Sequence, residues 1–350
     1  MPTNLDTDSF RVGVVGNNFG YKELLPVLNS IKNVSTTFAR PREYLPGQEK
    51  QIFELGTKTQ DFSEMLGDER LQMIFIAVPP NSQFLLGKAI LESNKDLYCE
   101  KPIGINFNEA NELNLIRTSL KKSVFVGFQF RFDPGLILLK SLVTSKFLTE
   151  VSRIEVNWHT IGSSGLYDEL NWRNNVKLGG GVHRDFLSHV IDYLRWTTND
   201  LVLSSLANLT LDTAVKPDTK KVTLISDKSD HPAIKINISR GIMTKSFWNI
   251  VVIFDSGECT ISSEFPFSMS SYSIKFNGND DFCNYVSDLL LRNNFLVNGL
   301  NLKSAREYAL KQYFEKIVDN VFKNGRNILP NLEDAKFTQK ISDNIQELLL

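Results

Sequence analysis

The chain has 350 residues, which is enough for two domains that each have a hydrophobic core. Lys and Arg together number 39 and Asp and Glu 40, so the net charge of -1 argues against nucleic-acid binding through bulk positive charge. Three scattered cysteines fit a reducing compartment and argue against a disulfide framework or a cysteine-based metal site. We read no signal peptide and no apolar run of the roughly 18 residues that a membrane span needs, so we expect a cytoplasmic protein that binds neither membrane nor nucleic acid.

A β-branched run at residues 10–15 is followed by a turn that starts at Gly16 and then by a helical pattern. This order predicts a strand, a glycine turn and a helix whose backbone N–H groups approach a pyrophosphate. The usual G-x-G-x-x-G spacing would place glycines where this chain has Asn18 and Tyr21. Because Asn adopts left-handed backbone more readily than most residues, we expect Asn18 to preserve the turn. The alternative is an ordinary turn without a ligand.

The next predicted strand, residues 34–39, ends in Arg40, which is followed by Pro41 and Arg42. In dinucleotide-binding folds an acidic residue at this position holds the ribose 2′-OH of NAD, whereas an Arg accommodates the 2′-phosphate of NADP. We therefore expect NADP as the preferred cofactor, with NAD as the other possibility. The alternative is a pair of solvated arginines in a loop.

Strands and helices continue to alternate through the first part of the chain. This alternation predicts an α/β fold with a doubly wound parallel sheet, the Rossmann arrangement, in a domain over residues 1–127. The further elements that we expect are strands at 58–59, 73–78, 95–99 and 123–127, and helices at 43–55, 62–66, 82–93 and 108–120.

Glu100, Lys101 and Pro102 follow the short strand at residues 95–99. The carboxyl ends of parallel strands are where α/β sheets bind ligands, and a proline restricts the backbone there. An amine at this place can donate a hydrogen bond to a ribose, a carbonyl or a hydroxyl at a reacting carbon. The alternative for Lys101 is a surface lysine at a strand end.

The second half of the chain, residues 128–350, contains repeated alternating runs. They predict a C-terminal α+β domain with a large, mostly antiparallel open sheet. The runs lie at residues 151–158, 201–211, 219–226, 232–239, 247–255 and 257–263.

Three glycines at residues 179–181 precede a helical pattern that carries Asp185 and His189. Residues at i and i+4 share a helix face, so we expect the carboxylate to orient the imidazole. A histidine titrates near neutral pH and can exchange a proton with an alcohol. The alternative is a hydrogen bond inside the helix without catalysis. His183 and His189 lie at i and i+6, on different faces, and no further ligands cluster with them, so we predict no metal site.

Two arginines are candidates for substrate contacts. Arg131 follows the last strand of the first domain and could meet a phosphate or a hydroxyl, or form a salt bridge at the domain junction. Trp172 and Arg173 lie in a polar loop, where they suit a sugar or nicotinamide face or anchor the loop.

Six motifs follow one another along the chain: the glycine turn, Ala-Val-Pro-Pro-Asn, Cys-Glu-Lys-Pro, Gly-Phe-Gln-Phe-Arg-Phe, Asn-Trp-Arg, and Gly-Gly-Gly-Val-x-x-Asp-x-x-x-His-x-x-Asp. Their order resembles that of the glucose–fructose oxidoreductase, inositol dehydrogenase and rhizopine catabolism protein family (Gfo/Idh/MocA), and the residues from Tyr308 to Ile345 resemble its closing helices.

The resemblance implies an NAD(P)-dependent oxidoreductase that acts on a CH–OH group of a sugar, cyclitol or nucleotide-sugar. It implies Lys101, Asp185 and His189 as catalytic residues. It also implies a homodimer or homotetramer that assembles through the C-terminal sheet, with last helices that can pack back on the first domain. A catalytically silent NAD(P)-binding regulator of the same fold is the alternative.

Taken together, the motifs and the resemblance predict two sets of binding residues beside the catalytic ones. For the cofactor they are Gly13, Gly16, Asn18, Phe19, Gly20, Arg40, Val78, Pro79, Asn81, Gln83, Glu100, Lys101 and Gln129, with Gln83 standing where a His is frequent in the family. For the substrate they are Arg131, Trp172, Arg173, His183 and Asp185.

Overall fold

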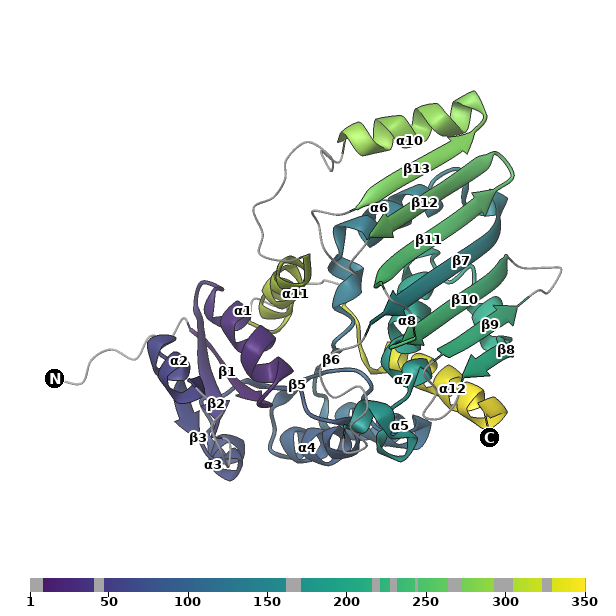
Figure 1. The fold of residues 1–350 in the computed structure, drawn as a ribbon. Helices are drawn as coiled ribbons and strands as arrows, with labels where there is room; N and C mark the ends of the chain where they lie inside the picture. Colours follow the sequence, from purple (N-terminus) through teal and green to yellow (C-terminus); the bar gives the residue numbers. More distant parts are fainter. Residues whose placement is uncertain are drawn as a thin grey trace. The chain divides into compact units, whose positions relative to one another are not determined.

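The fold is that of a computed structural model (Figure 1), in which the chain forms two units. Unit 1 comprises Met1–Gly127 and Leu310–Lys336, and unit 2 comprises Phe128–Ala309 and Phe337–Leu350. The structure describes residues 9–40, 47–161, 171–215, 221–226, 232–242, 245–263, 272–292, 305–322 and 329–349.

Unit 1 is built on a six-stranded parallel sheet with the strand order β3-β2-β1-β4-β5-β6. The order reverses between β1 and β4, and this is the point at which open α/β sheets bind ligands beyond the carboxyl ends of their strands. The predicted Rossmann sheet is confirmed. Its strands are β1 (Phe10–Val15), β2 (Val34–Ala39), β3 (Lys58–Gln60), β4 (Met73–Ile76), β5 (Asp96–Cys99) and β6 (Val124–Val126).

The helices of unit 1 lie between these strands, as the alternation predicts. The helix expected at residues 82–93 begins two residues earlier, because Pro80 suits the first turn, where its missing N–H is not needed. Residues 43–46 of another expected helix lie outside the described residues. The observed helices are η1 (Gly20–Leu24), α1 (Leu25–Asn29), α2 (Gln48–Glu54), α3 (Phe62–Gly67), α4 (Pro80–Glu92) and α5 (Phe107–Leu120).

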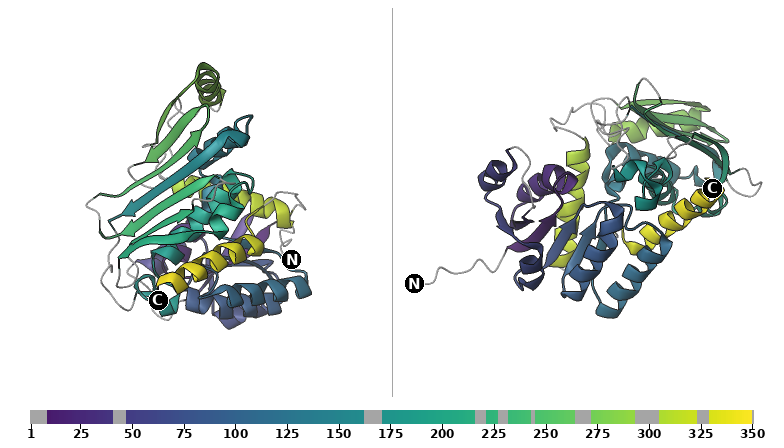
Figure 2. Two further views of the ribbon diagram at one scale, coloured as in Figure 1. Left: turned by 90° about the vertical axis from the view of Figure 1, so that its right-hand side faces the viewer. Right: turned by 60° about the horizontal axis from the view of Figure 1, so that its bottom comes forward.

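The helix α11 (Ala305–Phe322) supplies a late part of the chain to the core of unit 1. The ring of Phe314 packs edge-on against Phe75 and Tyr98, with centroids 5.2 and 5.3 Å away. The hydroxyl of Tyr313 donates to the backbone oxygen of Val126 at 2.8 Å. A parallel sheet needs apolar cover on both faces, and α11 contributes to that cover (Figure 2).

Unit 2 is built on a seven-stranded sheet with the order β13-β12-β11-β7-β10-β9-β8. Only the β7–β10 pair is parallel, so the predicted mostly antiparallel sheet is confirmed. The strands are β7 (Val151–Thr160), β8 (Thr210–Val215), β9 (Lys221–Ser226), β10 (Ala233–Arg240), β11 (Phe247–Phe254), β12 (Gly257–Ser263) and β13 (Ser273–Gly278).

Two details of this sheet differ from the prediction. The run at residues 201–211 forms the helix α9 (Leu203–Ala207) before β8 begins at Thr210. Its apolar residues also fit a helical spacing, and Ser205 and Leu206 are buried. The edge strand β13 was not predicted, because its partly buried positions alternate with exposed ones over only six residues.

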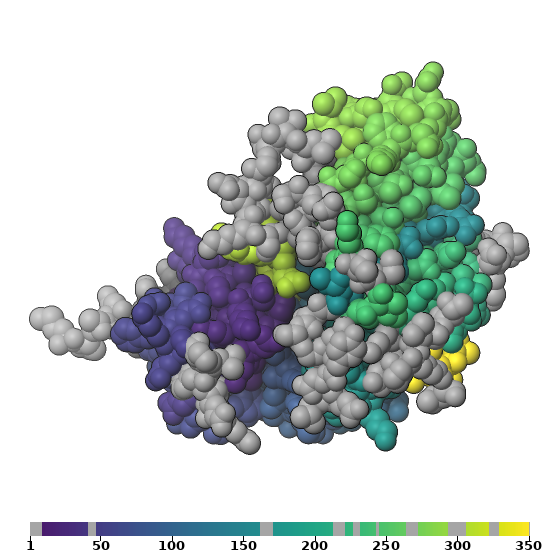
Figure 3. Space-filling view, in the orientation of Figure 1, coloured from purple at the N-terminus to yellow at the C-terminus, as the bar shows by residue number. Residues whose placement is uncertain are grey.

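Helices cover one face of the unit 2 sheet. In Figure 1, α6 (Pro134–Val143) and α8 (Leu187–Thr197) lie behind it, and the rotated views of Figure 2 show helices on one side of the sheet only. The described helices of unit 2 thus leave the other face bare. Much of that bare face lies at the surface in Figure 3. The side chains between sheet and helices, such as Trp248, Tyr193 and Phe147, form the core of the unit. No described helix is long and apolar enough to cross a membrane.

Candidate functional site

The turn after β1 can be built only with glycine at position 16. Gly16 has a φ of +132°, and a Cβ there would lie 2.3 Å from the backbone oxygen of Ala77. The turn therefore passes directly over the end of β4, at the reversal point of the sheet. Asn18 is exposed, and its φ is not positive, so the left-handed backbone that we expected at Asn18 is wrong. Gly16 alone supplies the unusual conformation in this turn.

The second glycine of the turn, Gly20, allows the helix to approach the strand. A Cβ at Gly20 would lie 2.9 Å from the backbone oxygen of Val15. The helix begins there with a π-turn, in which the Leu25 N–H donates to Gly20 O. A π-turn contains one more residue than an α-turn, so it compensates for a glycine that comes one position early. Tyr21 is buried against Phe38, with ring centroids 5.9 Å apart.

Gly13 has a packing role in the structure. It lies inside β1, and a Cβ there would come within 2.6 Å of the Met65 sulfur on α3. The cofactor contact that we predicted for Gly13 therefore gains no support, because its place is filled by the core of unit 1.

Arg40 lies at the carboxyl end of β2, where its N–H donates to Gln60 O. Its guanidinium is 3.6 Å from the carboxylate of Asp61, and the two side chains are 50% and 57% exposed. An ion pair that is this exposed is weak, so Arg40 can turn to another anion at little cost. Arg42 lies outside the described residues.

Lys101 follows β5 and is partly exposed, and its peptide bond to Pro102 is cis. The buried side chain of Gln83, on α4, donates from its Nε2 to the backbone oxygens of Glu100 and Pro102, the latter at 2.6 Å. These two bonds fix the backbone on both sides of Lys101. Gln83 thus positions Lys101. The two hydrogen bonds account for the burial of the Gln83 side chain, and the cofactor contact predicted for Gln83 stays a prediction.

The Glu100 carboxylate accepts a hydrogen bond from the Tyr98 hydroxyl at 2.7 Å. A Cβ at Gly127 would lie 2.6 Å from the same carboxylate, so Gly127 makes room for it. Burial, above all, and the neighbouring carboxylate raise the pKa of Tyr98 well above its usual value, which keeps the hydroxyl a donor. Glu100 is therefore held by unit 1 itself.

The residues after β4 form the next segment of this edge. The backbone oxygen of Pro79 accepts from the N–H groups of Ser82 and Gln83, which starts α4. Val78 is partly exposed, and Pro79 and Asn81 are exposed, as contacts with a ligand beyond the strand ends require.

In unit 2, the triple glycine lets the loop with Trp172 lie against the start of α7 (Val182–Asp185). A Cβ at Gly180 would lie 2.0 Å from Trp172 O, and Gly181 N–H donates to Arg173 O at 3.0 Å. The glycines therefore let the backbone of residues 172 and 173 pack directly against the backbone at the start of α7. Residues 162–170, which precede the loop, lie outside the described residues.

Asp185 is only 4% exposed, and two arginines face its carboxylate. Arg173 Nε donates to Oδ2 at 3.2 Å, and Arg240 Nη1 is 3.6 Å from the same atom. Arg240 Nη2 also donates to Arg173 O and to Asn174 Oδ1, at 2.6 and 2.8 Å. Sequence reasoning missed Arg240, because it ends β10, far along the chain, and no motif surrounds it.

His189 lies on α8 among aromatic rings. Its ring centroid is 4.2 Å from that of Phe130 and 6.2 Å from that of Trp158, and the side chain is 5% exposed. The single helix that we expected over Asp185 and His189 is wrong. The helix α7 ends at Asp185 and α8 begins at Leu187, and the Asp185 carboxylate meets arginines from the loop and from β10.

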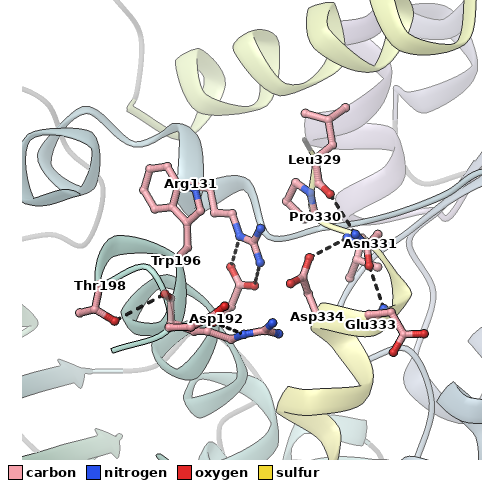
Figure 4. A network of polar contacts seen from close by, with 12 residues as sticks. Arg131, Asp192, Trp196, Thr198, Leu329, Pro330, Asn331, Glu333 and Asp334 are labelled. Atoms are coloured by element: carbon pink, nitrogen blue, oxygen red, sulfur yellow. Dashed lines mark hydrogen bonds and ion pairs between the residues drawn. The ribbon is translucent and has the colours of Figure 1, made fainter. Parts of the chain in front are cut away.

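Arg131 forms a bidentate ion pair with Asp192 (Figure 4). Its Nε donates to Oδ2 at 2.9 Å and its Nη2 to Oδ1 at 2.5 Å, and both side chains are buried. Of the two alternatives predicted for Arg131, the structure shows the salt bridge, with both partners in unit 2. The ion pair joins the turn η2 (Gln129–Phe132) to α8. The neighbouring Gln129 is buried as well, so its predicted cofactor contact stays a prediction.

His183 is fully buried, and its backbone oxygen accepts from Ser342 on α12 (Leu332–Leu349). Burial and the adjacent Arg184 guanidinium lower the pKa of His183 to about 3, so the ring is neutral at pH 7. The substrate contact predicted for His183 therefore gains no support. No group of three or more His, Cys, Asp or Glu side chains among the described residues is arranged to hold a metal ion.

Comparisons with known proteins identify the family. A family model described as an oxidoreductase family with an NAD-binding Rossmann fold matches residues 10–128, and the GFO/IDH/MocA C-terminal domain matches residues 137–230. The chain therefore belongs to the Gfo/Idh/MocA family of oxidoreductases. The predicted family resemblance is confirmed.

Individual relatives are distant. The uncharacterized oxidoreductase sll0816 of Synechocystis is 26% identical over 211 residues, which are 60% of this chain and 57% of that protein. The oxidoreductase P35 of Formosa agariphila is 22% identical over 293 residues, 81% of each chain. The rhizopine catabolism protein MocA of Rhizobium meliloti is 25% identical over 240 residues, 66% of this chain and 71% of the relative.

Solved structures share the fold over almost the whole chain. The WlbA dehydrogenase from Bordetella pertussis, in complex with NADH and UDP-GlcNAcA, has a TM-score of 0.76 at 13% identity and covers 98% of this chain and 96% of its own. The 3-ketoreductase KijD10 from Actinomadura kijaniata, with NADP and TDP-benzene, has a TM-score of 0.72 at 14% identity and covers 97% of each chain.

Proposed function

We propose that the protein transfers a hydride between NADP(H) and a hydroxyl or carbonyl carbon of a sugar, cyclitol or nucleotide-sugar. The observation that carries the proposal is the edge of the unit 1 sheet. There Gly16 brings the β1 turn over the end of β4, and Gln83 holds Lys101 at the end of the neighbouring β5. The family membership supports it, as do structural neighbours solved with NADH and UDP-GlcNAcA or with NADP and TDP-benzene.

The residues at this edge fit a dinucleotide. The close approach at Gly16 leaves no room for a side chain, as a pyrophosphate cradle requires. The partly exposed Val78 follows the end of the neighbouring β4, and the exposed Asn81 lies in the first turn of α4. When bound, the nicotinamide supplies or accepts the hydride. Arg40 at the end of β2 would meet the 2′-phosphate of NADP, leaving its exposed pair with Asp61.

The protein's own groups handle the proton and the charge. We assign His189 as the group that gives or takes the proton of the reacting hydroxyl, because an imidazole can both donate and accept a proton. The Lys101 ammonium would stabilise negative charge that develops on the same oxygen. Asp185, held in place by Arg173 and Arg240, would accept a hydrogen bond from a neighbouring hydroxyl of the substrate.

A titration of the purified protein with NADPH and NADH, followed by nicotinamide fluorescence, tests the cofactor assignment. We expect NADPH to bind more tightly, and Arg40→Asp to shift the preference toward NADH. Asp61→Asn is the informative partner variant, because it removes the competing anion and should leave or strengthen the NADPH preference. An unchanged NADPH/NADH ratio in Arg40→Asp would show that Arg40 does not read the phosphate.

Turnover separates the enzyme from a nucleotide-binding regulator. With NADPH or NADP bound, a panel of sugars, cyclitols and nucleotide-sugars should produce a change in nicotinamide absorbance with at least one member. Tight cofactor binding without turnover of any panel member would favour the regulator.

We also propose that the bare face of the unit 2 sheet joins two copies of the chain. In the middle of this face Asn249, Asn157 and Asn237 stand in register on three strands and bond to one another at 2.9 and 2.8 Å. The apolar Val251 and Ile253 on β11 are only partly buried beside them. Sedimentation of Val251→Arg should show a smaller species than the parent protein; an unchanged oligomer would place the contact elsewhere.

A further inference from the structure

The guanidinium of Arg173 is held on one edge and one face, while its other edge is open. Its Nε donates to Asp185 Oδ2 at 3.2 Å, and its Cζ lies 4.4 Å from the centroid of the Trp172 ring. Among the described residues no side chain or backbone atom accepts from Nη1 or Nη2. The side chain is 40% exposed although the carboxylate that it contacts is buried.

The second arginine at the Asp185 carboxylate, Arg240, is buried and bonded to the loop. Arg240 is 6% exposed, and its Nη2 donates to Arg173 O and Asn174 Oδ1 while Nη1 faces Asp185. Two guanidinium groups thus face one carboxylate. Because Arg240 is buried and bonded to the loop backbone, the half-exposed Arg173 is the one of the two that a ligand from solvent can reach.

A guanidinium with two free N–H groups on one edge matches a carboxylate or phosphate, which accepts two parallel hydrogen bonds. Here Asp185 and the Trp172 ring fix the orientation of the plane before any ligand arrives. A group that is fixed in advance loses less conformational entropy on binding, so the affinity for a matching ligand rises. A neutral hydroxyl carries no negative charge and cannot accept two parallel hydrogen bonds in this way.

We infer that Arg173 selects a substrate that carries an anionic group, a carboxylate or a phosphate, next to the hydroxyl that Asp185 binds. This inference rests on the proposed function, which it deepens by naming the class of substrate. Arg240 is then a positioning residue, because it holds the backbone of Arg173 and one side of Asp185.

The test measures the binding of three related probes to the full-length protein by calorimetry, with and without saturating NADPH. The probes are glucose 6-phosphate, glucuronate and glucose, which share a ring and differ in their charge. We expect at least one anionic probe to bind about 10- to 100-fold more tightly than glucose, the gain typical of hydrogen bonds to a charged group. Preferential binding of glucose 6-phosphate would identify the anionic group as a phosphate, and preferential binding of glucuronate would identify it as a carboxylate.

The variant Arg173→Gln should abolish this preference while NADPH binds as before. Arg173→Lys should keep only part of this preference, because an ammonium group cannot donate the two parallel hydrogen bonds that a guanidinium donates. Arg70→Gln is the matched control: Arg70 is also a half-exposed arginine bonded to an aspartate, Asp68, but it lies before β4, at the opposite edge of the unit 1 sheet. It should leave all three affinities unchanged.

The outcomes separate the inference from the function beneath it. Equal binding of the three probes, no binding of any, or a preference that survives Arg173→Gln would overturn the anion assignment while NADPH still binds. Failure of NADPH itself to bind would instead remove the proposed function. If Arg173 only anchors its loop, Arg173→Gln lowers the melting temperature without changing the ratio of anionic to neutral affinity.

Discussion

The candidate residues of unit 1 and unit 2 are positioned in different ways. At the strand ends of unit 1 the backbone decides the geometry: Gly16 clears Ala77, and Gln83 bonds to peptide oxygens around Lys101. In unit 2 charged side chains decide it, since Asp185 is held by guanidinium groups from a loop and from β10. The first arrangement depends on short stretches of sequence, whereas the second depends on residues that only the fold brings together.

This difference implies that the two units will fail in different ways when they are changed. A substitution at the strand edge of unit 1 should affect the backbone and the cofactor together. A substitution around Asp185 should leave the cofactor bound while it alters stability or chemistry.

The largest effect is expected at His189. His189→Ala should lower turnover about 100- to 10,000-fold, because a positioned acid or base contributes on that order. NADPH affinity should remain, since His189 belongs to unit 2. His159→Gln serves as control, as that ring contacts Ser239 and Phe247 on the bare face of the sheet. Full turnover in the His189 variant would remove it from the mechanism.

Gly16→Ala should destabilise unit 1 by about 4 kcal/mol, because a Cβ would meet Ala77 O at 2.3 Å in a backbone conformation that side chains rarely adopt. Urea unfolding should show a lower free energy of unfolding, and NADPH titration should show a weaker affinity for NADPH in the same variant. Gly67→Ala, where no atom lies within 4 Å of the added Cβ, should change stability by less than about 0.5 kcal/mol. A stable Gly16→Ala protein with normal NADPH affinity would contradict the backbone argument.

Arg240→Gln should cost about 3 kcal/mol of unfolding free energy, because it removes a charge that compensates the buried Asp185 carboxylate. The affinity for NADPH should stay unchanged in Arg240→Gln, whereas it should fall in Gly16→Ala. The double variant Arg240→Gln with Asp185→Asn should recover part of the stability, since the buried carboxylate that Arg240 helps to compensate is then replaced by a neutral amide. Additive losses in the double variant would show that the two side chains do not depend on each other.

An effect that appears only when the pH is changed concerns Asp133, which is buried at the start of α6. Burial raises the pKa of Asp133 to about 6, although the Tyr272 hydroxyl and two backbone N–H groups oppose the shift. A raised pKa means that the folded state binds the extra proton, so this group's contribution to stability falls as pH rises from about 4 to about 6. The expected loss is about 3 kcal/mol.

Asp133→Asn removes this titration and keeps the shape of the side chain. Relative to the parent protein, the variant should therefore gain about 3 kcal/mol between pH 4 and pH 7, measured by urea unfolding at both values. Comparing the two proteins cancels the contributions of other groups, such as Asp68, whose lowered pKa acts in the opposite sense. A difference between the two proteins that does not change with pH would show that Asp133 does not titrate in this range.

Much of the fold follows from local patterns. The parallel sheet of unit 1 was predictable because short apolar runs alternate with helical patterns, although the start of α4 at Pro80 was missed by two residues. The strands of unit 2 were mostly predictable as well, but their partners were not: alternation cannot show that β10 pairs in parallel with β7. The segment at residues 201–211 was wrong because its apolar spacing fits both a strand and a helix.

The site was less predictable than the fold. Local sequence placed Gly16 and Lys101 at the correct edge, because both follow a strand directly. It could not show that α7 ends at Asp185 and α8 begins at Leu187, or that Arg131 forms an ion pair with Asp192. These arrangements depend on contacts between residues that are distant in sequence, and no short motif reports them.

The π-turn at Gly20–Leu24 has a consequence for how this chain is aligned with others. A deletion of one residue before a helix normally rotates every later side chain by one position around the helix axis. Here the wider turn absorbs the missing residue, so the apolar face of α1 keeps its orientation toward the sheet. Inserting one glycine between Asn18 and Phe19 should convert the π-turn to an ordinary α-turn and leave Leu25, Val27 and Leu28 where they are.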